Sequence, residues 1–323
     1  MKNINGYALY NVLRTTNSGF SKWGFAEKDG KSHFIKEFID PIWPVCQDML
    51  DPAMVEHKKQ ICEEYEQRSK LLYRVINDSS DGNLVRIEDF FRWESHYYLV
   101  MEKVDAISLD EVRRIAVDDK LRICKALVHC LGRLHAAGIV HADIKLDNIL
   151  FRKLPSGKVT AKLIDFDNCF WEKQPPKPDE EIHGDLVYMA PETFVMMQNE
   201  EGTIDRAIDV FALGIVFHQI FSGALPSFDT ASYDYPFEAV LDGARLEISD
   251  AIPGKWRELI ARMTEGSRES RINLREAEAI LKGESGKTSE PETEPVPGPI
   301  PEPATPVETP AEPTSFFAPA GDL

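Results

Sequence analysis

The chain has 323 residues, 43% of them hydrophobic, and its 37 basic and 54 acidic residues give a net charge of −17 at pH 7. A chain of this size can bury one large core or two modest ones, and so acidic a chain has little to offer the phosphates of a nucleic acid. No stretch approaches the roughly 20 consecutive apolar residues of a membrane-spanning helix, and the first residues lack the apolar core of a secretory signal. We therefore expect a cytoplasmic protein with no nucleic-acid or membrane partner.

The first third of the chain is predicted to be rich in strands. Residues 8 to 36 alternate short apolar runs with Gly, Asn and Ser, and "SHFIKEF" predicts a strand that contains Lys36. Two further strands are indicated by "LVRIEDFFRW" and "HYYLVMEKV". A lysine inside a strand is worth explaining, although an isolated one is usually a surface residue.

A long helix is predicted between these strands. Asp51 is suited to the N-cap and Pro52 to the first helical position. Apolar residues then recur with helical spacing and predict a helix of roughly six or seven turns. The apolar stripe comprises Met54, Ile61, Tyr65, Leu72 and Val75.

The remainder of the chain is predicted to be helical, followed by a tail. Helices are indicated by "KLRICKALVHCLGRLHAAG", "DVFALGIVFHQIFSG" and "KWRELIARMTEG". From Glu284 onward, 40 residues hold 10 of the 21 prolines and 8 acids against one lysine. Such a segment cannot bury enough surface to offset its chain entropy, so residues 284–323 are expected to be a disordered acidic tail, which could bind a partner.

The cysteines indicate neither disulfides nor a zinc site. There are five, far apart and with no C-x-x-C pair. We expect reduced, mostly buried thiols at Cys46, Cys62, Cys124, Cys130 and Cys169.

Two apolar stretches are interrupted by acids. "HADIKLDNIL" contains Asp143 and Asn148, and "KLIDFDNCF" contains Asp165, 22 residues after Asp143. Acids beside strand-like apolar runs are costly unless they are paired, metal-bound or catalytic. Carboxylate and amide oxygens favour Mg²⁺, which is usually shared with substrate phosphates. The pattern therefore points to phosphoryl transfer.

These motifs carry a resemblance to a known family. "HADIKLDN" resembles the catalytic loop H-R-D-L-K-x-x-N, "DFD" the metal-binding D-F-G, and "YMAPE" the A-P-E motif of eukaryotic-type Ser/Thr protein kinases. "DVFALG" and "ESRINLREAEAIL" resemble two of the family's later helices. The resemblance covers residues 8 to 283 and implies an α+β bilobal fold: an N-lobe of antiparallel sheet plus one long helix (1–103) and a mostly helical C-lobe (104–283).

The resemblance assigns roles residue by residue. Asp143 would accept or orient the proton of the substrate hydroxyl, and Lys145, typical of Ser/Thr-specific members, would steady the transferred phosphoryl group. Asn148 and Asp165 would hold Mg²⁺. Lys36 would bind the α- and β-phosphates of ATP.

The resemblance also assigns supporting roles. Glu192 is expected to pair with Arg271, and Asp209 to brace the backbone of the catalytic loop. Met101 falls at the gatekeeper position. The hinge that meets adenine would then run from Glu102 to Val104.

The loop that covers the phosphates departs from the family pattern. It reads "TNSGFSKW", so Thr16, Ser18 and Ser21 stand where the family has glycines, and Trp23 stands where it has valine. Gly19 remains at the tip. Backbone amides can cradle phosphate without the glycines, but residues with a Cβ approach it less closely.

Three further departures lie near the catalytic motifs. Ala142 replaces the family's arginine, and no Ser or Thr occurs between Asp165 and Pro191, so phosphorylation of Ser or Thr there is not expected to be the switch. Asp167 replaces the glycine of D-F-G. Asp185 replaces a threonine, and could pair with Lys145 or repel the catalytic acid.

The helix glutamate that should pair with Lys36 is not evident. The family register puts Arg68 at its position, whereas Glu64 lies one turn earlier on nearly the same face. Glu66 points to another side of the helix. We expect Glu64 to be the partner.

Three functions are compatible with the pattern. The first is an ATP- and Mg²⁺-dependent kinase that phosphorylates Ser or Thr of a protein substrate. The second is a pseudokinase that acts as a nucleotide-binding scaffold, which the glycine-poor loop, Asp167 and Asp185 suggest. The third is a small-molecule phosphotransferase like the aminoglycoside or choline kinases, whose metal motif can also read "IDFD".

Overall fold

The computed structural model describes residues 2–15, 21–45, 51–177, 184–199 and 202–282. The chain divides into two compact units, Met1–Ser285 and Gly286–Leu323, and the described residues all belong to the first. The expected tail lies outside the described residues.

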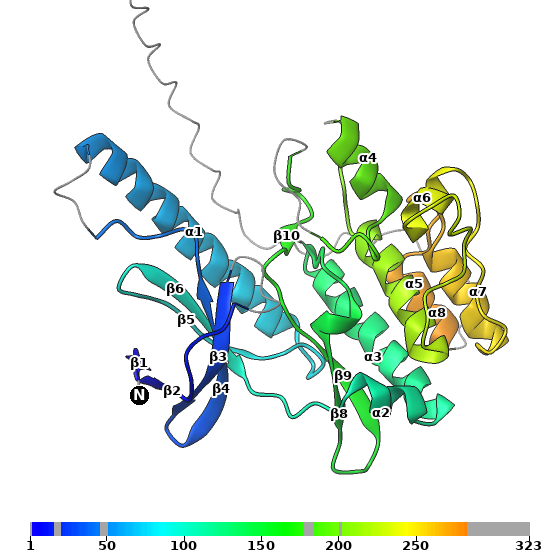
Figure 1. Ribbon diagram of the computed structural model, residues 1–323, viewed down its shortest axis with the longest axis horizontal. Helices are drawn as coiled ribbons and strands as arrows, with labels where there is room; N and C mark the ends of the chain where they lie inside the picture. The colour runs from blue at the N-terminus through cyan, green and yellow to red at the C-terminus, as the bar shows by residue number, and fades with distance from the viewer. Residues whose placement is uncertain (1, 16–20, 46–50, 178–183, 200–201, 283–323) are drawn as a thin grey trace, which may run out of the picture. The chain divides into compact units, whose positions relative to one another are not determined.

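The first part of the chain forms a six-stranded antiparallel sheet (Figure 1). Its strands run in the order β1-β2-β3-β4-β6-β5. Their bounds are Asn3–Ile4 (β1), Tyr7–Leu9 (β2), Ser21–Lys28 (β3), Lys31–Phe38 (β4), Ile87–Trp93 (β5) and His96–Glu102 (β6). The strands predicted around Lys36 and in the two later stretches are thereby confirmed.

The two faces of this sheet carry different side chains. One face packs into a small core around Ile35, with Ala26 and Val100 beside it. Because side chains alternate along a strand, Lys36 points to the opposite face. The register places Trp23 directly across from Lys36. This opposite face, the Lys36 face, is the one that α1 covers.

Helix α1 spans Pro52–Ser79. Its start is as predicted: Asp51 is the N-cap, and its carboxylate accepts a hydrogen bond from the Ala53 amide at 2.9 Å. With 28 residues it is longer than the six or seven turns expected. It packs on the sheet through Tyr65, whose ring contacts those of Phe38, Phe90 and Tyr97.

The predicted apolar stripe of α1 is wrong in its first half. Met54 and Ile61 are 51% and 45% exposed, and the buried residues lie one position later, at Val55 and Cys62. Spacing identifies a stripe, but when two stripes lie side by side only the packing decides which one is covered. The remaining buried residues are Ser69, Leu72, Tyr73, Ile76 and Ser79.

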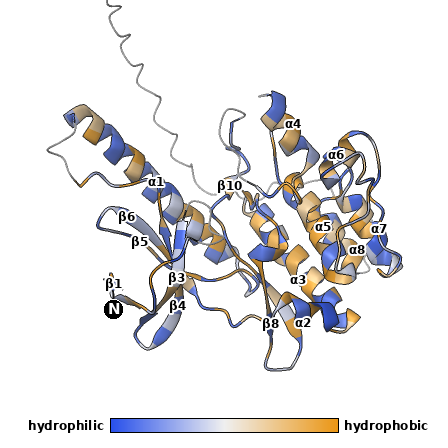
Figure 2. Cartoon of the chain, in the orientation of Figure 1, coloured by the Kyte–Doolittle hydropathy of each residue, from blue (hydrophilic) through white to orange (hydrophobic). Residues whose placement is uncertain are grey.

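The second part of the described chain is mainly helical. Its helices are α2 (Leu109–Arg114), α3 (Val117–Ala136), α4 (Pro191–Asn199), α5 (Ala207–Ser222), α6 (Pro236–Leu241), α7 (Gly254–Met263) and α8 (Leu274–Lys282). Helix α5 is buried along nearly its whole length, and Figure 2 shows it as strongly hydrophobic. The helix predicted there, and those predicted at α3 and α7, are confirmed.

Two short antiparallel strand pairs follow α3. β7 (Ile139–Val140) pairs with β10 (Phe170–Trp171), and β8 (Ile149–Lys153) pairs with β9 (Val159–Leu163). The two acid-containing loops of the sequence leave the ends of β7 and β9. This is how segments more than 20 residues apart meet at one place.

Cys62, Cys124, Cys130 and Cys169 are free and buried, as expected, and Cys46 lies outside the described residues. Within the described ranges, no helix combines the length and apolar character needed to cross a bilayer.

Candidate active site

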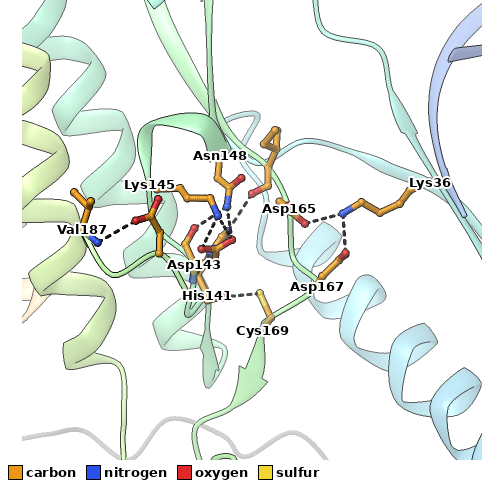
Figure 3. A network of polar contacts seen from close by, with 11 residues as sticks. Lys36, His141, Asp143, Lys145, Asn148, Asp165, Asp167, Cys169 and Val187 are labelled. Atoms are coloured by element: carbon orange, nitrogen blue, oxygen red, sulfur yellow. Dashed lines mark hydrogen bonds and ion pairs between the residues drawn. The ribbon is translucent and has the colours of Figure 1, made fainter. Parts of the chain in front are cut away.

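The loop between β7 and β8 holds a catalytic-type acid among polar partners (Figure 3). Lys145 Nζ lies 2.9 and 2.8 Å from the two carboxylate oxygens of Asp143. Asn148 Nδ2 donates to the Asp143 carbonyl and to its Oδ2, both at 2.8 Å. Lys145 and Asn148 thus fix the side chain of Asp143, which is only 8% exposed.

A carboxylate of α5 binds the backbone of this loop. Asp209, fully buried there, accepts hydrogen bonds from the amides of His141 and Ala142, both at 2.8 Å. Its Oδ2 also lies 2.9 Å from His135 Nε2. Ala142 has a φ of 63°, a left-handed conformation that a non-glycine residue adopts only when its surroundings enforce it. The expected bracing role of Asp209 is confirmed.

The loop that follows β9 docks against the same structure. His141 Nε2 lies 3.1 Å from the carbonyl oxygen of Ile164, and the buried ring of Phe166 contacts the His141 ring edge-on. Asp165 is left-handed as well, with a φ of 66°. The segment that carries Asp165 is thereby anchored to the loop that carries Asp143.

Lys36 joins the sheet to this loop. Its Nζ lies 2.8 Å from Asp165 Oδ1 and 2.7 Å from Asp167 Oδ2 (Figure 3). Burial lowers the pKa of Lys36, but the two carboxylates outweigh it, so the net pKa is raised. Burial raises the pKa of Asp167 to about 6 against the opposing charge of Lys36, whereas that charge outweighs burial and lowers the pKa of Asp165.

The expected pair between Glu64 and Lys36 is not formed in the described structure, which corrects the prediction. Glu64 is exposed on α1 and accepts a hydrogen bond from Gln60 at 2.9 Å. Glu66 pairs with Lys70 instead. The partner that sequence reasoning missed is Asp167. The signal was present as two separate oddities, the helix without a suitable glutamate and the acid in place of the loop glycine.

Of the residues expected to contact nucleotide, only some are described. Thr16, Ser18 and Gly19 lie outside the described residues, and Ser21 opens β3 as a buried residue. The side chain of Glu102 pairs with Lys162.

Two residues expected to form the hinge, and an aromatic pair on the Lys36 face, are described. The amide of Glu102 donates to Arg86 O at 2.9 Å, and Val104 follows the end of β6. The ring of Trp23 stacks on that of Phe34 at 5.8 Å, on the Lys36 face. A base that enters beside Lys36 would meet aromatic rings.

The last segment with predicted roles runs from Asp185 to Glu192. Asp185 Oδ1 accepts from the Val187 amide at 3.0 Å, so it serves as a local turn-former in place of the two roles considered for it. Glu192 binds Arg271 Nη1 at 2.6 Å and Nη2 at 3.0 Å, which confirms the predicted pair.

The donor set suits a magnesium ion that is completed by its substrate. No group of three or more His, Cys, Asp or Glu side chains in the described residues could hold a metal ion unaided. Asn148 donates its amide NH₂ to Asp143, which leaves its amide oxygen as an acceptor, and Asp165 adds a carboxylate from the loop after β9. Two hard oxygen donors fit an ion that keeps waters and phosphate oxygens as its other ligands.

Comparisons with known proteins agree with this geometry. The family model described as "Protein kinase domain" matches residues 54–281. Calcium-dependent protein kinase 4 of Plasmodium falciparum is 27% identical over 60% of this chain and 37% of its own length. Protein kinase STUNTED of Arabidopsis thaliana is 26% identical over 69% of this chain and 35% of its own length.

A further relative, the dual serine/threonine and tyrosine protein kinase of Xenopus laevis, is 36% identical over 41% of this chain and 14% of its own length. The chain thus covers well under half of each of these relatives. The family match covers most of the chain, from α1 to α8, and the fold is the α+β arrangement of a sheet, one long helix and a helical second part that a bilobal kinase-like protein has. The chain belongs to the protein kinase domain family.

Proposed function

We propose that this protein is a protein kinase that uses ATP and Mg²⁺ to phosphorylate Ser or Thr hydroxyls of a protein substrate. The observation that carries the proposal is the convergence of Lys36, Asp143, Lys145, Asn148 and Asp165 from three separate segments. Phosphoryl transfer needs mainly positioning and charge neutralisation, and these five side chains offer both.

Each side chain has a role suited to its contacts. Asp143 accepts the proton of the attacking hydroxyl, and Lys145, 2.8 Å from that carboxylate, neutralises charge on the transferred group. Lys36 binds the α- and β-phosphates. Asn148 and Asp165 would hold Mg²⁺, which when bound neutralises charge on the phosphates. The hinge from Glu102 to Val104 separates the proposed lobes 1–103 and 104–283.

The proposed specificity for Ser and Thr follows from Lys145. Lys145 is typical of Ser/Thr-specific members, while the matched relatives include a dual-specificity enzyme. The bridge from Glu192 to Arg271 supports a protein kinase over a small-molecule phosphotransferase, because both residues belong to protein-kinase motifs. The substrate is thus proposed to be a protein.

The experiment that tests this function is phosphoryl transfer with labelled ATP and Mg²⁺. We expect phosphate on Ser or Thr of a generic protein substrate, with Asp143→Asn and Lys36→Met lowering the rate at least a hundredfold, within the range of general acid–base contributions. Asp147→Asn, an exposed acid in the same loop, serves as the matched control and should retain activity. Equal rates in all four proteins would refute the proposal.

A nucleotide-binding scaffold is the second candidate. The observation in its favour is the stack of Trp23 on Phe34 beside Lys36, since rings this large leave a nucleotide less room than small aliphatic residues do. ATP that raises the melting temperature without any transfer would favour this candidate.

A further inference from the structure

Lys36 is a buried cation whose two carboxylate partners come from the same loop. The lysine side chain is 8% exposed, so its charge must be compensated inside the protein. Two carboxylates compensate it, from Asp165 at 2.8 Å and from Asp167 at 2.7 Å. Both come from the loop after β9, and neither comes from α1.

Helix α1, which the structure describes throughout, offers no acid on its buried face. Its buried residues are Val55, Cys62, Ser69, Leu72, Tyr73, Ile76 and Ser79. Glu64 is exposed and accepts a hydrogen bond from Gln60, and Glu66, whose side chain is 26% exposed, is paired with Lys70. A lysine has a flexible four-carbon stem, so a fixed anion is needed to aim it. In this structure these two glutamates of the helix are bound elsewhere, and neither supplies that anion.

We propose that Asp167 is the positioning residue of Lys36 and takes the part that the family resemblance gives to a glutamate of the helix. The inference rests on the proposed function, in which Lys36 binds phosphates. The two carboxylates on one ammonium then have separate tasks. Asp165 shares its charge with the metal ion when that ion is bound, whereas Asp167 keeps the lysine aimed at the phosphates (Figure 3).

The surroundings of Asp167 support this assignment. The charge of Asp167 acts on two tyrosines of α1: burial first, and then this charge, raise the pKa of Tyr65 and Tyr73. Tyr65 is also hydrogen-bonded to Ser69. Ser69 is 7% exposed and thus lies within the same buried contact zone. Ser69 is thus a buried position of α1 at which a replacement carboxylate can be tested.

The test measures the reactivity of Lys36 itself. Wild type and Asp167→Asn are treated at pH 8 to 9 with an isotope-coded acetylating reagent, and the labelling rate of Lys36 is measured by mass spectrometry. An opposite charge within about 4–6 Å raises a lysine pKa by about one unit or more, so its loss should speed labelling roughly tenfold. Lys162, buried and paired with Glu102, is the reference lysine in the same samples and should not change.

Two further variants guard against a change in access. Asp185→Asn removes a carboxylate of the same site that binds the Val187 amide, and should leave Lys36 labelling at the wild-type rate. Asp167→Asn combined with Ser69→Glu should restore slow labelling. Asp167→Glu, which keeps the charge, should stay within about threefold of wild type and remains informative if the Asn variant does not fold.

The outcomes separate this inference from the proposed function. The labelling needs neither nucleotide nor transfer, so a wild-type rate in Asp167→Asn would overturn the role of Asp167 even in an active kinase. Conversely, faster labelling without phosphoryl transfer would retain that role and refute only the kinase activity. In an active enzyme, Asp167→Asn should lower kcat/KM on the wild-type background and have no further effect on the Lys36→Met background.

Discussion

Asp209 shows how much a single buried carboxylate can support. It accepts three hydrogen bonds, from two backbone amides of the catalytic loop and from the His135 ring. One of these amides belongs to Ala142, whose left-handed backbone costs energy wherever it is not enforced. Asp209 therefore stabilises the fold and shapes the loop that presents Asp143.

We expect Asp209→Ala to lower the free energy of unfolding by about 3 kcal/mol or more, because several buried donors lose their acceptor. Phosphoryl transfer at a temperature where the variant is folded should fall as well. The matched control is Asp205→Ala, which removes a half-exposed acceptor of the Ala207 amide and a 3.8 Å ion pair with Arg268, and should cost about 0.5–2 kcal/mol. Urea denaturation of the wild type and both variants measures the free energy of unfolding. Equal losses in the two variants would contradict the bracing role of Asp209.

At the scale of elements, the close approach of α5 and α7 depends on one glycine. A Cβ on Gly214 would lie 2.8 Å from Thr264 Cγ2 and 3.0 Å from Met263 Cβ. Neither neighbour is the far end of a flexible chain, so the helices would have to move apart.

Gly214→Ala should therefore destabilise the protein although alanine favours helix. Overpacking costs about 1–3 kcal/mol, more than the gain of about 1 kcal/mol in helix propensity. Gly132→Ala in α3 is the same exchange without the clash, since its nearest neighbour would be Leu274 Cβ at 3.9 Å, and should stabilise the protein. Opposite signs in chemical denaturation are expected, and two gains would show that the α5–α7 contact adjusts freely.

Elements also show what the sequence could and could not predict. Local signals sufficed for the N-cap at Asp51 and the strand around Lys36, because capping and alternation depend on near neighbours. They failed for the buried face of α1, where Val55 lies inward and Met54 does not. The partner of Lys36 was beyond such signals, since Asp167 lies 131 residues away and meets it only in the folded chain.

At the scale of the whole molecule, Arg271 links parts of the helical region. Its side chain is completely buried, binds Glu192 at the start of α4, and donates to Ala207 O of α5 at 2.9 Å. Its guanidinium also lies over the Phe211 ring. Removing it leaves the Glu192 carboxylate in a buried site without its partner.

We expect Arg271→Met to cost about 3–5 kcal/mol, a large part of the stability of a typical domain. Arg257→Met is the same exchange at an arginine whose partner Asp250 is almost fully exposed, and it should change the free energy of unfolding by about 1 kcal/mol or less. Calorimetry compares the two, and a similar small effect of both would show that the Arg271 bridge is not needed.

The carboxylate of Asp167 also bears on the order in which substitutions arose in such a chain. A count of motif positions finds two defects, a helix without its glutamate and a metal loop without its glycine. If the acid has moved from one segment to the other, these are two halves of one exchange. Either change alone would then be harmful, whereas the two together are harmless, so the order of substitution matters. An acid gained first in the loop, while the helix still held its own, would have given an intermediate with a surplus negative charge. An acid lost first from the helix would have left the lysine without a carboxylate to position it.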